Sequence, residues 1–278
     1  MSSHHPHPVA FVLGGGGIRG AVQVGMLQAL LEHGVRPDLV VGSSIGAING
    51  AIVAAHPGPE AAGLLHRAWN SPQARAVYGD SVGRQLHRLI TTRTHLNSPR
   101  PLQRLLQDLL GTDTRFEDLP TPLRVVAASI ESAAEHWFTT GPLLPAVLAS
   151  ASVPGLLPPT RVGDEHYLDG GIVNSIPLQA ALDAGARTVY VLHVGRVDEP
   201  LTAPTTPVET ARVAFEIARR HRWARDLAEL PDHVDLHVLP TGGALDGDQN
   251  LGSYKRMGTT PTRIDRAHRA TRAYLEGR

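Results

Sequence analysis

The first fifty residues alternate short apolar runs with helical segments, and this alternation limits the folds open to the chain. Val9 to Leu13 is a continuous apolar run, and Ala21 to His33 has helical apolar spacing before Gly34, which is suited to end a helix. A second short apolar run spans Asp38 to Val41, and an Ala-rich helical stretch follows from Ile45 to about His56. Strands and helices in this order form a parallel sheet covered on its faces by helices. We therefore predict an α/β fold with a mostly parallel central sheet flanked by helices in three layers.

The rest of the chain continues this pattern after one interruption. Residues 57–122 have helical patterns but no convincing strand, which predicts a helical insertion over one end of the sheet. The helices expected there span residues 60–69, 82–91 and 101–110. Further strands are predicted at 123–129, 136–139, 188–194 and 234–239, with helices at 143–151, 177–184, 207–230 and 261–275. No internal repeat is visible, so one domain with an insertion is the simplest organisation.

The composition excludes several classes of function. Lys plus Arg and Asp plus Glu both number 26, and a nucleic-acid-binding protein would normally carry a basic excess. The absence of cysteine excludes disulfides, cysteine nucleophiles and thiolate metal sites. Residues 1–8, MSSHHPHP, lack the basic and apolar regions of a signal peptide, so we expect a disordered tail and a cytoplasmic protein. The three histidines of this tail leave metal binding or a purification tag as alternatives.

A glycine-rich loop, GGGGIRG at residues 14–20, follows the first predicted strand. Its main-chain N–H groups could face a nucleotide phosphate or another anion. A dinucleotide-binding fold needs an acidic residue at the end of the second strand to bind a ribose. That strand runs instead into Val41, Gly42, Ser43 and Ser44, so a nucleotide is disfavoured.

The second loop, GSSIG at residues 42–46, has the G-x-S-x-G pattern between a strand and a helix. In this setting a sharp turn exposes the central serine at the carboxyl end of the sheet, so Ser44 is the candidate nucleophile. The alternative is that Ser44 only caps the helix, and Ser43 is expected to form a local hydrogen bond or cap. A serine nucleophile needs a base, usually histidine. His233, His237 and His268 lie in the appropriate part of the chain, but none is in a loop that would present it, which favours core or surface roles.

A third pattern lies far downstream. Residues 149–154 read ASASVP, and Asp169 leaves a predicted strand into Gly170 and Gly171. Taken alone, an aspartate before two glycines is best explained as stabilising a tight turn. The three patterns in this order, however, resemble those of the patatin-like phospholipases, and the similarity covers most of residues 9–196.

The resemblance implies a lipid acyl hydrolase with a Ser-Asp dyad and no catalytic histidine. Ser44 matches the nucleophile and Asp169 the proton acceptor, and Gly15, Gly16 and Gly17 match the loop that forms the oxyanion hole. Arg19 matches the arginine of that loop, where a structural salt bridge is an equal alternative to a substrate contact. The supporting positions of the motifs are Gly20, Gly42, Gly46, Gly170 and Gly171. Many family members have Asp or Ser where Gly14 stands here, which could reduce the rigidity of the loop.

An ordinary Asp is a weak base at neutral pH, so the dyad requires an Asp169 that is desolvated by an apolar wall. Leucines of the insertion could supply this wall and an acyl pocket, although packing in the helix core is the simpler role for each. The candidates are Leu102, Leu105, Leu106, Leu109 and Leu110. No cofactor or metal is expected, because the chain lacks the usual metal-binding motifs.

The resemblance divides the chain into a tail (1–8), a catalytic domain (9–196) and a C-terminal strand and helices that complete the domain (197–278). The expected partner is a lipid or acyl ester, with room for transient contact with a membrane surface and none expected with nucleic acid. An acyltransferase using the same dyad and a non-catalytic lipid-binding protein stay open as alternatives. The physiological substrate and the oligomeric state are open as well.

Overall fold

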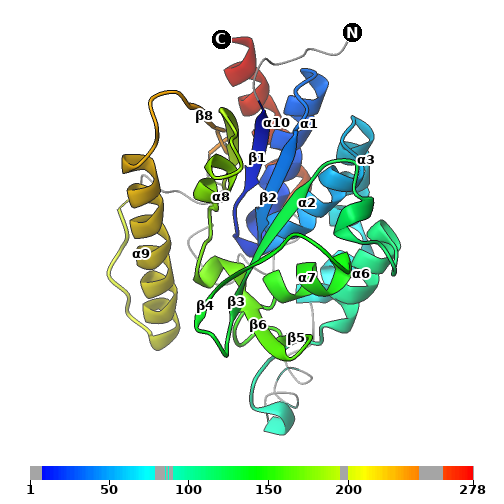
Figure 1. The fold of residues 1–278 in the computed structure, drawn as a ribbon. Helices are drawn as coiled ribbons and strands as arrows, with labels where there is room; N and C mark the ends of the chain where they lie inside the picture. The colour runs from blue at the N-terminus through cyan, green and yellow to red at the C-terminus, as the bar shows by residue number, and fades with distance from the viewer. Residues whose placement is uncertain are drawn as a thin grey trace.

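The computed structural model describes residues 8–78, 85, 87, 90–194, 200–243 and 259–277. Within these residues an eight-stranded sheet forms the middle layer of the fold (Figure 1). Its strands are β1 (Val9–Leu13), β2 (Leu39–Ser43), β3 (Leu123–Ser129), β4 (Ala134–Phe138), β5 (Thr160–Val162), β6 (Glu165–Asp169), β7 (Thr188–Leu192) and β8 (Asp235–Val238). The order is β5-β6-β3-β2-β1-β7-β8, and β4 also pairs with β3. Pairing is parallel from β3 through β2, β1 and β7 to β8, and antiparallel where β4, β5 and β6 take part.

Helices cover both faces of this sheet. They are α1 (Ala21–Glu32), α2 (Ile45–Ala55), α7 (Leu143–Ser150), α8 (Leu178–Leu182), α9 (Pro207–Ala228) and α10 (Thr260–Glu276). Alternate residues of β1 point to opposite faces. Phe11 and Leu13 join a core with α1, α2, α7 and α10, whereas Ala10 and Val12 join a second core with α8 and Trp223 of α9. The predicted three-layer α/β architecture is confirmed.

The segment between α2 and β3 is helical, as predicted. It contains α3 (Glu60–Asn70), α4 (Pro72–Tyr78) and α6 (Arg100–Leu110), and the buried face of α6 consists of Leu102, Leu106 and Leu110. The helix predicted at residues 82–91 lies largely outside the described residues. Figure 1 shows these helices beside α2 and α7, on the opposite side of the sheet from α9.

The structure differs from the sequence prediction mainly at short elements and boundaries. The edge strand β5 was not predicted, because its three residues are too few to show an alternation of apolar and polar side chains in the sequence. Helix α8 is shorter than expected and ends at Leu182, since Gly185 turns the chain with a φ of 83°. From the C-terminal segment, β8 pairs with β7, and α10 packs along α1. The predicted disordered tail falls on residues 1–7, which are outside the described residues.

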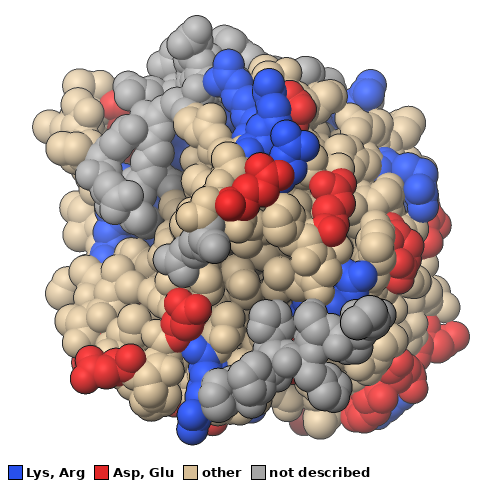
Figure 2. All heavy atoms as spheres, turned by 90° about the horizontal axis from the view of Figure 1, so that it is seen from above, with Lys and Arg blue, Asp and Glu red and all other residues tan. Residues whose placement is uncertain are grey.

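The helices that the structure describes include none long and apolar enough to cross a bilayer. Figure 2 shows the face that carries the chain termini, where acidic and basic side chains lie beside one another. This mixture agrees with the equal numbers of acidic and basic residues in the chain.

Candidate active site

The register of β3 brings two distant strand ends together. Val126 pairs with Ser43, the last residue of the parallel strand β2, and the next residue of β3, Ala127, pairs with Asp169 of the antiparallel strand β6. Because β4 occupies the other edge of β3, the strands β2 and β6 share one edge and meet at their carboxyl ends. Ser44, which follows β2 directly, is therefore placed beside Asp169, although the two are 125 residues apart in sequence.

Ser44 lies in a strained turn between β2 and α2. Its backbone has φ 56° and ψ −123°, a combination that a non-glycine residue rarely adopts. A Cβ at Gly46 would lie 2.1 Å from the carbonyl oxygen of Leu13, and a Cβ at Gly42 would lie 2.7 Å from the Cα of Ala47. Only glycine therefore fits on either side of the serine. The Ser44 side chain makes no capping hydrogen bond, so it does not serve as the side-chain cap of α2, the alternative considered from the sequence.

The Ser44 hydroxyl instead donates a hydrogen bond of 2.5 Å to Oδ2 of Asp169. The other carboxylate oxygen, Oδ1, accepts a hydrogen bond of 2.8 Å from the N–H of Gly171. Asp169 thus stabilises the local turn, as its sequence context indicated, and also faces the serine. Burial raises the pKa of Asp169 from 3.8 to about 6, despite the opposing effect of the hydrogen bonds from Ser44 and Gly171. The carboxylate is a stronger base than an exposed aspartate.

The ASAS segment at the end of α7 holds both members of this pair by their backbones. The Ser150 hydroxyl oxygen accepts a hydrogen bond of 2.9 Å from the N–H of Ser44. Two residues later, the carbonyl oxygen of Ser152 accepts the N–H of Asp169 at 2.9 Å. In the sequence this motif was recognised only as part of the resemblance to the patatin-like phospholipases. Its spacing allows one short segment to fix the distance between serine and carboxylate.

The glycine loop passes directly over Ser44. A Cβ on Gly15 would lie 3.3 Å from the Cβ of Ser44. The N–H of Gly15, one of three predicted oxyanion donors, already donates to the carbonyl oxygen of Ser175 at 2.8 Å. The N–H groups of Gly16 and Gly17 have no acceptor among the described residues. The carbonyl oxygen of Ser175, a residue that the sequence did not indicate, therefore binds one of the three predicted donors. The N–H groups of Gly16 and Gly17 are left for an oxyanion.

The remaining motif positions lie around this loop and the Asp169 turn. Arg19 is half-buried in the 3-10 turn η1 (Gly17–Gly20), and its role stays a prediction. A Cβ at Gly20 would clash with Ile45, and a Cβ at Gly170 would lie 2.1 Å from the carbonyl oxygen of Val126. A Cβ at Gly171 would lie 3.3 Å from the ring of Phe215 on α9, and this helix packs against the turn.

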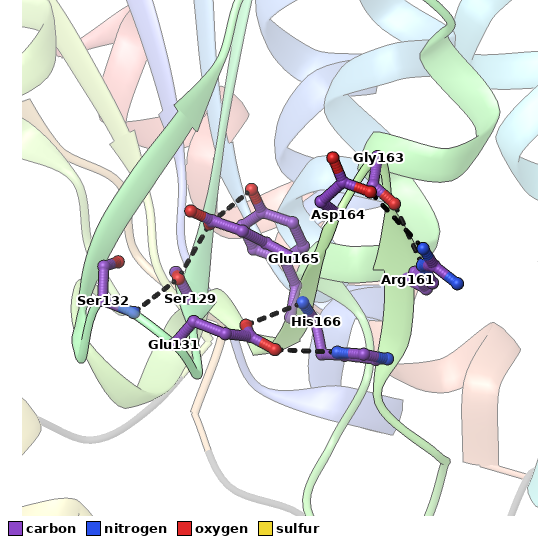
Figure 3. Close-up of polar contacts among 9 residues, drawn as sticks. Ser129, Glu131, Ser132, Arg161, Gly163, Asp164, Glu165 and His166 are labelled. Carbon is purple, nitrogen blue, oxygen red and sulfur yellow. Dashed lines mark hydrogen bonds and ion pairs between the residues drawn. The ribbon is translucent and has the colours of Figure 1, made fainter.

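A set of polar contacts fixes β6, which carries Asp169, to the turn after β3 (Figure 3). Oε2 of Glu165 accepts hydrogen bonds from the hydroxyls of Ser129 and Tyr167, at 2.9 and 3.0 Å. Glu131 binds both the N–H and the ring Nδ1 of His166, each at 2.8 Å. Burial and the neighbouring Glu165 raise the pKa of Tyr167 to about 12, so the phenol stays a donor. These contacts support the position of the carboxylate from the outer end of its strand.

The histidines considered as bases lie elsewhere. His237 contacts Asp235 and the Tyr274 hydroxyl, His268 contacts Glu32, and His233 is exposed. In the described part of the chain no histidine is hydrogen-bonded to Ser44 or Asp169. Ser43 is fully buried, and its hydroxyl has no partner there, contrary to the expected local hydrogen bond. The described residues also hold no group of three His, Asp or Glu side chains arranged to bind a metal.

Two adjoining apolar cavities extend from Ser44 beneath the helical insertion. The nearer cavity is lined by Ser44 itself together with residues of α2, α4 and α6, Asn97 and the segment after α7. The deeper cavity is lined by α2, α3, α4 and α6. Both include Ile45, Ile48, Val77 and Leu102. Of the leucines predicted as candidates for such a wall, Leu105 and Leu109 line the deeper cavity, whereas Leu106 and Leu110 line neither cavity and pack in the core.

Comparison with known families identifies a match that covers most of the structured core. The sequence profile of the family described as patatin-like phospholipase matches residues 11–182. The chain is 34% identical over 193 residues to mouse patatin-like phospholipase domain-containing protein 7, and 35% identical over 231 residues to human patatin-like phospholipase domain-containing protein 6. These alignments cover 69% and 82% of this chain but only 14% and 16% of the relatives. The neuropathy target esterase sws of Drosophila melanogaster is 33% identical over 193 residues, 69% of this chain and 13% of that protein.

Solved structures share the fold at low sequence identity. VipD from Legionella pneumophila superposes with a TM-score of 0.50 at 16% identity, covering 98% of this chain and 67% of that one. Human GIVD cytosolic phospholipase A2, solved with methyl gamma-linolenyl fluorophosphonate, gives a TM-score of 0.50 at 12% identity, covering 97% and 58%. At these identities the likeness concerns the fold alone.

Proposed function

Because the chain belongs to the patatin-like phospholipase family, we propose that it is a lipid acyl hydrolase that cleaves carboxylic esters through Ser44 and Asp169. The observation that carries this proposal is the 2.5 Å hydrogen bond from the Ser44 hydroxyl to a buried carboxylate. An exposed turn aspartate would not need that contact, and a helix-capping serine would direct its hydroxyl to the backbone.

The proposed reaction proceeds in two steps. Oδ2 of Asp169 accepts the hydroxyl proton while Oγ of Ser44 attacks the ester carbonyl. The tetrahedral intermediate collapses, the bond to the alcohol oxygen breaks, and Asp169 returns its proton to that leaving oxygen. Water then attacks the acyl-enzyme while Asp169 accepts one of its protons. As the bond from the acyl carbon to Oγ of Ser44 breaks, Asp169 returns that proton to Oγ, which releases the carboxylic acid product and restores the free serine. With a pKa of about 6, Asp169 is largely ionised near neutral pH and ready to act as the base.

Charge on the carbonyl oxygen would be stabilised by the glycine loop. We assign the donor role to the N–H groups of Gly16 and Gly17, since the N–H of Gly15 is bound to Ser175. The positive end of the α2 dipole lies at Ser44 and adds to this field. Removal of one oxyanion donor typically costs about 100- to 1000-fold in turnover, so the loop should contribute more to the rate than the base does.

The apolar cavities supply a place for the acyl chain. Their lining is almost entirely Ile, Leu, Val and Ala, and the nearer cavity opens at the Ser44 side chain. An extended hydrocarbon fits such a surface, whereas a polar substrate would leave its hydrogen-bonding groups unpaired. The substrate is therefore proposed to be an ester of an apolar acyl chain, presented by a lipid. A cytoplasmic location and transient contact with a membrane surface belong to the same proposal.

A fluorophosphonate probe tests the proposal directly. We expect the wild-type protein to be labelled at Ser44 and to hydrolyse p-nitrophenyl esters, and Ser44→Ala to do neither. A wild-type protein that neither labels nor cleaves any ester would refute the hydrolase and leave the lipid-binding alternative. Mass spectrometry of products from a panel of phospholipids and acyl esters, with and without an added alcohol acceptor, would separate hydrolysis from acyl transfer.

A further inference from the structure

Two uncharged amide side chains lie fully buried beneath the glycine loop. Gln23 of α1 and Asn49 of α2 have no exposed surface, and both lie among the Ala, Val and Leu side chains of the core. An amide in such surroundings is costly unless its donors and acceptor are paired. The partners of Gln23 and Asn49 therefore indicate why polar groups are kept at these positions.

Those partners include the carbonyl groups at both ends of the glycine loop. Nε2 of Gln23 donates to the carbonyl oxygens of Gly14, at 2.7 Å, and Leu192, at 2.8 Å. Nδ2 of Asn49 donates to the carbonyl oxygen of Gly20, at 3.1 Å, and to Oε1 of Gln23, at 2.8 Å. The two amides are thus bonded to the first and last residues of the loop and to each other.

Trp69 of α3 completes the chain, because its Nε1–H donates to Oδ1 of Asn49 at 3.0 Å. Both N–H donors of each amide are now used, and both amide oxygens accept a hydrogen bond. Turning either amide over would place its oxygen against a carbonyl oxygen, so only one orientation of each satisfies the contacts. The chain Trp69–Asn49–Gln23 has a single low-energy arrangement.

We propose that Gln23 and Asn49 are positioning residues for the oxyanion loop, an inference that rests on the proposed hydrolase function. Neither touches the serine. Asn49 borders the deeper cavity, but its amide is fully used in hydrogen bonds with Gly20, Gln23 and Trp69. The two amides hold the carbonyl groups of Gly14 and Gly20, and the N–H groups of Gly16 and Gly17 lie on the segment between these two anchors. Oxyanion donors are effective when their direction is set before charge develops, and a loop of four consecutive glycines has little rigidity of its own. The buried amides supply that rigidity from below.

The test replaces Gln23 by methionine, which keeps the length of the side chain and removes its hydrogen bonds. The matched control is Gln28→Met on the same helix, where the lost amide contacts are to Glu32 and His66 and lie away from the loop. Four quantities are measured well below the unfolding temperature: kcat and KM for a short p-nitrophenyl ester, the Ki of an alkyl trifluoromethyl ketone, and the rate of fluorophosphonate labelling. The ketone forms a tetrahedral oxyanion with serine and so depends on the loop in the way the transition state does.

For Gln23→Met we expect kcat to fall by about 10- to 100-fold and the Ki of the ketone to rise by a similar factor, with KM changed by less than about threefold. Gln28→Met should leave kcat, KM and the Ki of the ketone each within about twofold of the wild-type values. A general loss of structure would not weaken binding of the ketone, measured by its Ki, while leaving the KM of the ester nearly unchanged. The inference is wrong if wild type is active and Gln23→Met keeps both kcat and Ki within about twofold. If wild type does not label at all, the proposed function itself fails instead.

A milder variant decides the matter if Gln23→Met does not fold. Trp69→Phe removes the donor to Asn49 and one of the two fused rings, but keeps an aromatic ring in the cavity wall. It should lower kcat by about two- to tenfold, with a parallel rise in the Ki of the ketone. Unchanged values for both would overturn the proposal.

Discussion

Replacing Asp169 by asparagine should abolish turnover and at the same time stabilise the protein at neutral pH. The asparagine oxygen can still accept the hydrogen bond from the N–H of Gly171, and its amide can donate to Ser44 Oγ. The packing is therefore kept, and what is lost is a group that can ionise. Without a base, Ser44 cannot transfer its proton, and activity should fall by at least about 100-fold.

The stabilisation follows from burial of the carboxylate. In the folded protein the pKa of Asp169 is raised to about 6, above the ordinary value of 3.8. The folded state therefore keeps a proton that the unfolded chain releases, so the contribution of Asp169 to stability is fully present below about pH 4 and is lost as the pH rises through about 6. A difference of about two pKa units corresponds to at most about 3 kcal/mol of stability. Wild type loses this stability as the pH rises, whereas Asp169→Asn does not.

Urea unfolding at several pH values measures this difference. Between pH 5 and pH 8 the stability of Asp169→Asn relative to wild type should grow by about 1 to 1.5 kcal/mol, because part of the effect already lies below pH 5. Asp164→Asn, at the exposed turn between β5 and β6, is the control and should retain activity. In wild type, kcat/KM should rise with pH through an apparent pKa near 6. Retained turnover in Asp169→Asn, or a stability difference that does not vary with pH, would refute the reasoning and return attention to the histidines.

Substitutions at three positions, Ser44, Gly46 and Leu102, test the turn and the cavity. Ser44→Gly and Ser44→Ala should both be inactive. Because glycine relieves the strain of the φ of 56°, urea unfolding should show Ser44→Gly to be more stable than Ser44→Ala by about 1 to 3 kcal/mol. Gly46→Ala should destabilise by about 1 to 3 kcal/mol or more, since its Cβ would meet the Leu13 carbonyl, whereas Gly63→Ala in α3 makes only ordinary contact and should be neutral or stabilising in the same melts. Leu102→Trp, which fills the junction of the two cavities, should lower kcat/KM for decanoyl esters about tenfold or more and change that for acetyl esters little. Equal losses for both esters would argue against an acyl site there.

Much of the fold was predictable because local rules decide it. Continuous apolar runs such as Val9–Leu13 can be satisfied only by burial on both faces of a sheet, and helical periodicity between them places the covering layers. Ser44 was predicted from its turn motif and Asp169 from the family resemblance, and the structure brings them into contact. Their catalytic roles stay a proposal that the labelling experiment tests.

Other parts of the site depend on contacts that no local pattern encodes. Ser150 binds the N–H of a residue 106 positions away, and the carbonyl of Ser175 takes up the N–H of Gly15 across the sheet. Gln23 and Asn49 appear in the sequence as polar interruptions of two helices, with nothing to show that they face one another. Such partners become visible only when the helices are packed.

The sequence by itself determined which elements form and which residues carry reactive groups, because strand burial, helical spacing and glycine turns are short-range properties. The tertiary structure alone decided that β2 and β6 end against each other on one edge of β3, since strand register is set by the pairing of segments far apart in the chain. That register places the hydroxyl of Ser44 on the carboxylate of Asp169. The surrounding burial, also a property of the packed molecule, raises the pKa of this carboxylate and makes it a usable base.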